Sequence, residues 1–287
     1  MKKADQSTGV TVASLCRRTG ISRQAFYKKQ VKREAVAVDE NLVIQWVKEI
    51  RMRHPRQGTR KLHKRLSTRM KSHGIRMGRD HLFELLKRHN LLIHRRRRYR
   101  CTTQSLHRFY TYPNRIRDKV LTGRNQVWVS DITYISTDEG FLYLSLITDA
   151  YTRKIVGYEI SDSLAVTGCK KALRMALASC HSWERPIHHS DRGIQYCCGK
   201  YTDVLIANGL TISMTEKDHC AENALAERIN GILKEEYLLG YTFKSKCQAK
   251  LCCIEAIKLY NTDRPHLSLN YQIPSEFHEA VMLEKAC

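Results

Sequence analysis

Three acidic residues carry the residue types and spacing that could do chemistry. Asp131 interrupts the aromatic and β-branched stretch VWVSDITYIS, Asp191 follows the short apolar stretch PIHHS, and Glu227 lies within the helical pattern AENALAERINGILKEEYL. A carboxylate in the middle or at the end of a buried strand is costly without a partner. For Asp191 that partner could be a base, a salt bridge or a metal ion.

The elements that must position these acids predict a mixed sheet. We expect strands at 127–136, 141–150, 153–161, 186–190 and 210–214, and helices at 165–181, 199–209 and 221–238. The first three strands read as an antiparallel meander, because short turns separate them. The order βββ-α-β-α-β-α is of the α/β class, with helices on the faces of the sheet. In such a sheet the strands that carry Asp131 and Asp191 can be neighbours.

The helix over 221–238 leaves two interpretations of Glu227. At about 100° per residue, Leu225, Ile229 and Ile232 form a buried stripe. The opposite face holds Asn223, Glu227, Asn230 and Lys234. Glu227 is therefore either part of a solvent-facing polar row or a member of a site. Glu222, Glu235 and Glu236 are rivals, but Glu222 points about 140° away from Glu227, so the two cannot serve one site.

A shared cation would explain why three carboxylates converge, because they cannot all stay ionised beside each other without one. Oxygen ligands favour Mg²⁺ or Mn²⁺. Two such ions about 3.5–4 Å apart activate an attacking oxygen and stabilise the leaving one during in-line displacement at phosphorus. The three acids therefore predict phosphodiester chemistry.

Three further polar residues are possible supports of this site. Asp149, in ITDAYTRKIVGYE, is either a rival ligand or an aspartate that caps a turn or forms a salt bridge. His189 and Ser190 flank Asp191 and either orient it through hydrogen bonds or are simple polar residues at a strand end.

The positive charge of the chain is concentrated in its first two fifths. Residues 1–120 hold 32 Lys and Arg against 8 Asp and Glu, whereas the remaining residues hold 18 against 20. This is typical of a polyanion-binding module joined to a near-neutral domain. No apolar run approaches the ~18 residues of a membrane span, and no signal peptide is visible. With 11 scattered cysteines and no CxxC pair, we expect reduced thiols in a cytoplasmic protein without a membrane partner.

Several basic segments are candidates for DNA contact. The segment VTVASLCRRTGISRQAFYKK predicts a helix, a turn at Gly20 and a second helix. This order is typical of a helix-turn-helix, although an ordinary basic helical hairpin would have the same sequence pattern. Residues 58–93 predict a second pair of helices, with Leu62 and Leu66 before a turn at Gly74, and NLVIQWVKEIRMRH between the two units predicts a third amphipathic helix. IHRRRRYRCTTQ is either a solvated linker or a strap that contacts phosphates. The candidates are Arg23, Gln24, Lys28, Arg60, Lys61, Arg79, Arg95, Arg96, Arg97, Arg98, Asn223 and Lys234.

The three acidic segments resemble a known superfamily. VWVSDITYI, HHSDRGIQY and AENALAERINGILKEEYL resemble the carboxylate motifs of DDE transposases and retroviral integrases, and 35 residues separate Asp191 from Glu227. YNTDRPHLSLNYQIPSEF resembles the segment that closes the core in bacterial insertion-sequence transposases of the two-frame OrfB type. HPRQGTRKLHKRL resembles the helical module that precedes that core.

The resemblance implies a ribonuclease-H-like integrase core with Asp131, Asp191 and Glu227 as catalytic residues and ligands of Mg²⁺ or Mn²⁺, with two ions expected. It implies cleavage of the ends of a mobile element, transfer of the freed 3′-OH to target DNA, and homo-oligomers on paired ends. It also implies a prokaryotic protein that is associated with the nucleoid. A second helix-turn-helix protein of the same element is a possible partner. Two alternatives stay open, namely a DNA-binding regulator of the element and a hydrolytic nuclease of the same fold.

The expected domain organisation follows from these segments. It comprises a helix-turn-helix-like segment at 1–45, a second helical module at 46–93, a basic linker at 94–125, the catalytic core at 126–240 and a C-terminal helical closure at 241–287.

Overall fold

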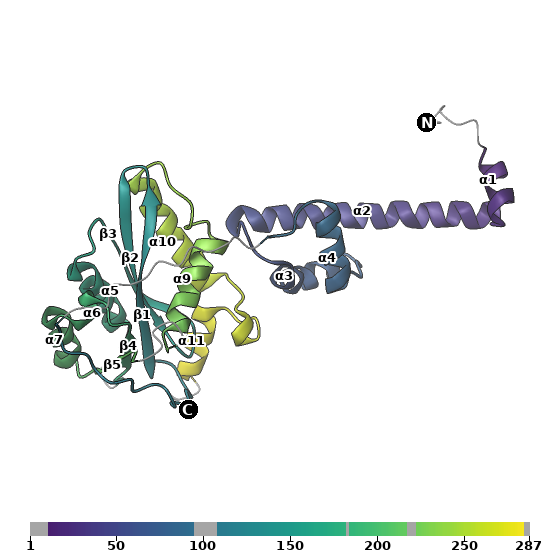
Figure 1. The fold of residues 1–287 in the computed structure, drawn as a ribbon. Helices are drawn as coiled ribbons and strands as arrows, with labels where there is room; N and C mark the ends of the chain where they lie inside the picture. The colour runs from purple at the N-terminus through teal and green to yellow at the C-terminus, as the bar shows by residue number, and fades with distance from the viewer. Residues whose placement is uncertain (1–10, 95–107, 182–183, 217–221, 284–287) are drawn as a thin grey trace. The chain divides into compact units, whose positions relative to one another are not determined.

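The computed structural model describes residues 11–94, 108–181, 184–216 and 222–283. The chain divides into two compact units (Figure 1). Unit 1 comprises residues 1–52 and 58–92, and unit 2 comprises residues 53–57 and 93–287. The predicted linker residues Arg95, Arg96, Arg97 and Arg98 lie outside the described residues.

Unit 1 is helical, with an apolar core that three helices share. Its helices are α1 (Val12–Thr19), α2 (Arg23–Arg53), α3 (Thr59–Ser72) and α4 (Arg79–Arg88). The core contains Val43, Ile44, Trp46 and Val47 from α2, Leu62, Leu66 and Met70 from α3, and Leu82, Leu85 and Leu86 from α4. The predicted helices on both sides of Gly74 are confirmed, because their leucines recur at helical spacing and are buried together.

The amino-terminal helices keep the predicted order, but the second is much longer than predicted. Gly20 forms the turn in the left-handed region (φ 69°), and Ser22 caps α2 through a 3.1 Å hydrogen bond that its hydroxyl accepts. α2 then continues to Arg53, so the helix predicted separately at 41–54 is its second half. α2 has no buried residue before Val43, so its first turns present their side chains to solvent.

Unit 2 is built on a five-stranded sheet of order β3-β2-β1-β4-β5 (Figure 1). The strands are β1 (Val127–Thr137), β2 (Gly140–Asp149), β3 (Ile155–Ser161), β4 (Ile187–Ser190) and β5 (Thr211–Met214). β1, β2 and β3 pair antiparallel, whereas β4 runs parallel to both β1 and β5. The predicted meander and mixed sheet are confirmed.

Helices cover both faces of this sheet. The helices of unit 2 are α5 (Val166–Ala178), α6 (Ile194–Cys197), α7 (Gly199–Ala207), α9 (Ala224–Glu236), α10 (Lys246–Thr262) and α11 (Pro274–Leu283). One core joins β1 and β2 to α9 and α10, and the other joins the sheet to α5 and α7. Along β1, alternate residues face opposite cores, so Trp128 contacts α5 and α7 while Ile135 packs with α9 and α10. The predicted ribonuclease-H-like arrangement is confirmed.

The segments that flank the sheet are held against it. Arg115 N donates a hydrogen bond to Ser213 Oγ of β5 (2.8 Å), so this part of the predicted linker is docked on unit 2. At the carboxyl end, Arg264 pairs with Glu236 of α9 at 2.8 Å and thereby fixes the segment after α10. No helix among the residues described is long and apolar enough to span a membrane.

Candidate active site

The first two acids meet because of the strand register. Ser130 of β1 and Ser190 of β4 are paired positions in a parallel ladder. Asp131 and Asp191 each follow directly, so they occupy adjacent places on the two central strands. The prediction that these two strands are neighbours is confirmed.

Asp131 has a strongly raised pKa. Burial and then the negative charge of Asp191 raise the pKa of Asp131 to about 7, with Glu227 adding a smaller effect in the same direction. Two hydrogen bonds oppose this rise, one from Asn230 Nδ2 to Oδ2 (2.7 Å) and one from Ile132 N to Oδ1 (2.9 Å). A like-charged neighbour in a poorly solvated place is what makes the ionised form unfavourable. The three acids are therefore electrostatically coupled in this structure.

Asp191 is held by the turn that follows β4. Its Oδ1 accepts a hydrogen bond from Gly193 N at 3.0 Å. A Cβ atom at position 193 would lie 3.0 Å from the same oxygen, so a larger residue would crowd the carboxylate. Glycine at this position therefore lets the backbone approach the acid closely.

Glu227 lies between two asparagines that anchor α9 to β1. Asn223, four residues before it, donates to Ser130 O (3.3 Å), and Asn230, three residues after it, donates to Asp131. Residues at these spacings share one helix face. Asn223 and Asn230 are buried at 2% and 6% exposure, whereas Glu227 is exposed. The asparagine pair thus fixes the turn of α9 that carries Glu227 beside Asp131.

The burial of Asn223 and Asn230 corrects the interpretation of this helix face as a solvent-facing polar row. The asparagines of the supposed solvent-facing row are buried against β1, and Leu225 of the supposed buried stripe is half-buried. The rival Glu222 is engaged elsewhere: Arg117 donates to its Oε1 (2.8 Å) and the N–H of Glu216 to its Oε2. Burial raises its pKa, but these hydrogen bonds outweigh that effect and lower the pKa to about 2.

The three predicted acids are not arranged as a complete metal-binding site. Within the described ranges, no group of three or more His, Cys, Asp or Glu side chains is arranged to hold a metal ion. The donor chemistry nevertheless fits a hard divalent cation, because the carboxylates supply oxygen and their mutual repulsion raises the pKa of Asp131. Their convergence as cation ligands stays a prediction.

A buried polar network on the other face of the sheet escaped the sequence prediction. His188 Nε2 lies 2.7 Å from Ser130 Oγ and 2.8 Å from the hydroxyl of Tyr201. Burial, with a smaller effect of His189, lowers the pKa of His188 to about 3, so its ring stays neutral. The network joins β1, β4 and α7 directly behind the two aspartates. The signal in the sequence was a polar residue in each of two buried strand segments, Ser130 in β1 and His188 in β4.

The possible supporting residues have distinct roles. Asp149 is a turn-capping aspartate, since its carboxylate accepts hydrogen bonds from the backbone of Asn125 (2.6 Å) and Thr152 (2.7 Å). His189 Nδ1 lies 2.9 Å from Ser213 Oγ, which ties β4 to β5. Ser190 Oγ donates to the carbonyl of Asp191 (3.0 Å), so it contacts the backbone of that acid.

The predicted DNA-contacting residues are dispersed. Arg23, Gln24 and Lys28 are exposed on the first turns of α2, and Arg60 is exposed on α3. Arg79 donates to Asp80 Oδ1 (2.8 Å). Lys61 and Lys234 are half-buried. Burial of Asn223 removes support for its role in DNA contact, and the other candidates stay predictions.

Comparison with known proteins identifies the family. The integrase core domain family matches residues 122–220, and a second integrase core domain family matches residues 208–274. The insertion element IS600 uncharacterized 31 kDa protein of Shigella sonnei is 37% identical over 269 residues, covering 92% of this chain and 97% of that protein. The chain belongs to the bacterial insertion-sequence transposases of the integrase superfamily. It is a DNA transposase of the DDE polynucleotidyl transferase type.

Two further comparisons concern parts of the chain. The transposase InsF for insertion sequence IS3A of Escherichia coli (strain K12) is 35% identical over 161 residues, covering 56% of either protein. The catalytic core domain of HTLV-2 integrase, solved in complex with magnesium, matches 54% of this transposase and 97% of that chain with a TM-score of 0.43 and 16% identity.

Proposed function

We propose that this transposase cleaves the ends of a mobile DNA element and joins the freed 3′-OH to target DNA, with Asp131, Asp191 and Glu227 as its catalytic acids. The observation that carries the proposal is the parallel register of β1 and β4, which brings Asp131 and Asp191 to adjacent positions. The negative charges of Asp191 and Glu227 both raise the pKa of Asp131. The register and these charges support a site that acids from three distant segments would share at the two neighbouring strands β1 and β4.

The group that would relieve this repulsion is Mg²⁺ or Mn²⁺, with two ions expected and the three acids as their ligands. Bound there, such ions activate the attacking oxygen and stabilise the leaving one. The carboxylates must be ionised to bind them, so binding would release the proton that the raised pKa of Asp131 favours.

The surrounding residues of the chain orient the acids. Asn230 holds one oxygen of Asp131, and the backbone of Ile132 holds the other. Gly193 N fixes Asp191 in the turn after β4. Because an in-line displacement tolerates little misplacement, groups held in this way contribute to rate through positioning.

DNA is the substrate in this proposal, both as element ends and as target. The positive charge of residues 1–120 supports DNA binding, because Lys and Arg that replace phosphate counterions supply sequence-independent affinity. Paired ends need more than one active site, so we expect a homo-oligomer on DNA. A second helix-turn-helix protein of the element stays a prediction.

A strand-transfer assay tests the function. The full chain is incubated with Mg²⁺ and the end DNA of the element that encodes it, and joined products are separated from nicked ends. We expect Asp131→Asn, Asp191→Asn and Glu227→Gln each to lower joining by at least about 10³-fold while DNA binding persists. Asp203→Asn, an exposed acid of α7, is the matched control and should leave joining unchanged.

The outcomes separate the proposed function from its alternatives. Joined products support the transposase. Nicked ends without joining indicate a hydrolytic nuclease, and DNA binding without either product indicates a regulator. Near-normal joining by any one of the three acid variants would show that this residue is not catalytic.

A further inference from the structure

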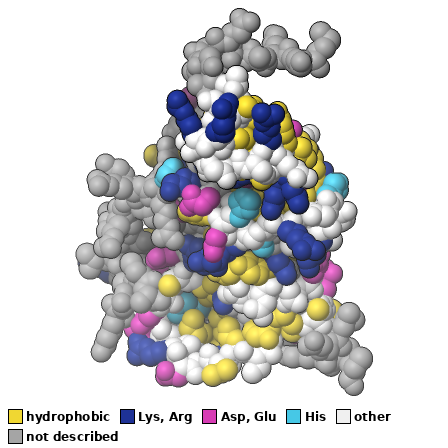
Figure 2. All heavy atoms as spheres, turned by 90° about the vertical axis from the view of Figure 1, so that its right-hand side faces the viewer, with side chains coloured by type: hydrophobic (Ala, Val, Ile, Leu, Met, Phe, Trp, Pro, Cys, Tyr) yellow, Lys and Arg dark blue, Asp and Glu magenta, His cyan; other side chains and the backbone are white. Residues whose placement is uncertain are grey.

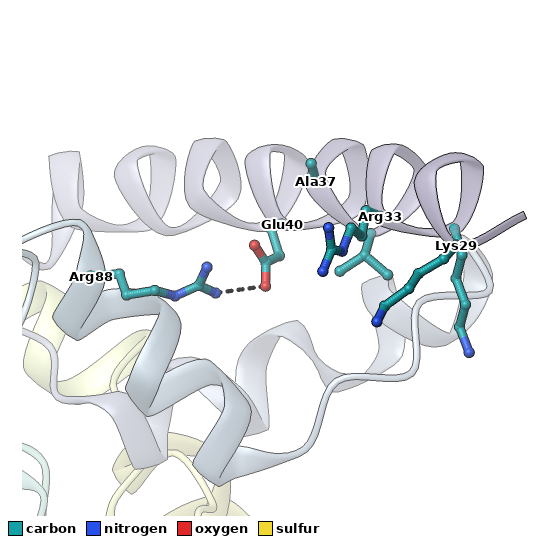
Figure 3. A pocket seen from close by; sticks show the side chains of 7 residues that line it. Lys29, Arg33, Ala37, Glu40 and Arg88 are labelled. Atoms are coloured by element: carbon teal, nitrogen blue, oxygen red, sulfur yellow. Dashed lines mark hydrogen bonds and ion pairs between the residues drawn. The ribbon is translucent and has the colours of Figure 1, made fainter. Parts of the chain in front are cut away.

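A basic groove lies within unit 1, where α2 faces the end of α4. It has a volume of about 480 Å³ and is lined by Lys29, Lys32, Arg33, Val36, Ala37, Glu40 and Arg88. The six residues from α2 follow at i, i+3, i+4, i+7, i+8 and i+11, so they share one face of that helix. Figure 3 shows Lys29 and Arg33 leaving α2 on the side that carries Glu40. We call this feature the α2–α4 groove.

Three cations of the α2–α4 groove, Lys29, Lys32 and Arg33, are available to an outside anion. Glu40, the acid of its lining, already pairs with Arg88 (2.7 Å) and His81 (3.0 Å). Glu34 accepts a hydrogen bond from Gln30 (3.1 Å). In the part of unit 1 that the structure describes, no carboxylate pairs with Lys29, Lys32 or Arg33. These exposed side chains therefore carry uncompensated charge.

We propose that the α2–α4 groove binds the phosphate backbone of duplex DNA. The proposal rests on the proposed function, which makes DNA the substrate. Lys29 and Arg33 are one helical turn apart, roughly 6 Å along the axis. A DNA strand carries one phosphate per roughly 3.4 Å of its axis, so successive cations of the groove can neutralise phosphates of one strand. Figure 2 shows Lys and Arg side chains gathered on the upper part of the face that it presents.

The groove differs from the helix-turn-helix face predicted from the sequence. With Lys29 at 0° on a helical wheel, Arg33 lies near 40°, whereas Lys28 lies near −100° and Arg23 near 120°. Arg23 and Lys28 thus point away from the groove although they lie on the same exposed turns of α2. Because Arg23 and Lys28 are themselves predicted DNA contacts, the control pair is Lys71 and Arg76, two exposed cations of unit 1 that do not line the groove.

The experiment compares Lys29→Gln/Arg33→Gln with Lys71→Gln/Arg76→Gln in the full chain. Binding to a fluorescent duplex of about 30 base pairs of arbitrary sequence is measured by anisotropy, with EDTA present, between about 50 and 200 mM salt. We expect the groove variant to lower the slope of log affinity against log salt by about 2, because each phosphate contact contributes about 0.9. The control pair should change the slope by less than half as much. Circular dichroism checks that both variants stay helical, as Gln is a good helix former.

Each result decides the proposal. Equal losses in both variants would show a general effect of charge and overturn the groove as the site. An unchanged slope in the groove variant would overturn it as well. If that variant kept its DNA binding but lost binding to polyglutamate, the groove would bind an acidic polypeptide and not DNA. A wild-type chain that binds DNA with the expected slope but joins no ends would contradict the proposed function and leave the groove standing.

Discussion

The two units of this transposase differ in whether they bury polar side chains. Every buried polar residue that the structure describes belongs to unit 2, whereas the buried positions described in unit 1 are apolar. Unit 1 keeps its charges at the surface, as Lys29 and Arg33 illustrate. A buried polar group is stable when its hydrogen bonds are made, and then it is also fixed in place. The contrast separates a unit that presents charge from one that positions atoms.

The largest expected effect concerns the buried ion pair of unit 2. Arg264 donates to both carboxylate oxygens of Glu236, at 2.8 and 2.9 Å, and its side chain is 3% exposed. Arg264→Ala leaves the acid without its cation and should lower the free energy of unfolding of unit 2 by about 3–5 kcal/mol. Denaturant unfolding followed by hydrogen exchange of the β1 and β4 amides measures this loss.

A double variant controls for the cost of losing side-chain volume. Arg264→Met with Glu236→Met removes both charges and should be clearly more stable than Arg264→Ala, because no buried charge is left unpaired. If Arg264→Ala cost less than about 1 kcal/mol, the buried pair of unit 2 would behave like an exposed one. The contrast between the units would then fail for charged groups.

The second prediction concerns positioning by Asn230. Asn230→Ala removes the 2.7 Å hydrogen bond to Asp131. Mg²⁺ affinity, measured by calorimetry on the full chain, should fall about 10–100-fold, as is typical when a residue that orients a metal ligand is lost. Asn208→Ala, at the exposed end of α7, is the control. Unchanged Mg²⁺ affinity in Asn230→Ala would show that this asparagine has a purely structural role.

What the sequence could predict depended on whether the order of the elements or a single side-chain contact decides the feature. The pairing of the strands that carry Asp131 and Asp191 was predictable, because the order of strands and helices restricts the topology. The length of α2 was also readable in principle, since no Gly or Pro occurs between Arg23 and Arg53. The middle part of α2 is charged and has no apolar periodicity, so the sequence pattern did not indicate one continuous helix.

The asparagines beside Glu227 show where such prediction ends. A helical wheel places Asn223 and Asn230 opposite the apolar stripe, which normally means solvent. Their burial follows from hydrogen bonds to Ser130 O and to the Asp131 carboxylate, which lie 93 and 99 residues away in the sequence. A polar residue gains such a partner through tertiary structure, which periodicity does not encode.

The third prediction uses the raised pKa of Asp131. A carboxyl whose pKa rises from an ordinary 3.8 to about 7 on folding binds more protons when folded. Without metal, the free energy of unfolding should therefore fall as the pH rises from about 4 to about 7. Asp131→Asn removes this effect and should be more stable than wild type by up to about 4 kcal/mol near pH 8, with the difference shrinking near pH 5.

Thermal unfolding in EDTA at the two pH values measures this difference. Added Mg²⁺ should stabilise the wild type and leave Asp131→Asn unchanged, since a ligand stabilises the state that binds it. A variant that is less stable than wild type at both pH values would contradict the repulsion among the three acids. It would also weaken the distinction between the units, because the ionised Asp131 carboxylate would then not destabilise unit 2.

The smallest expected effect belongs to the surface of unit 1. Arg69 pairs with Glu49 at 2.9 Å and lies 4.4 Å from the ring centroid of Trp46, with both charged side chains nearly half exposed. Solvent screens such a pair, so Arg69→Ala should cost at most about 1 kcal/mol, most of it from lost contact with the ring. Chemical denaturation monitored by hydrogen exchange in α2 and α3 measures the loss. Arg69→Lys keeps the charge but loses the planar group, so a similar loss there would assign the effect to stacking. A loss as large as that of Arg264→Ala would mean that unit 1 also depends on fixed polar contacts.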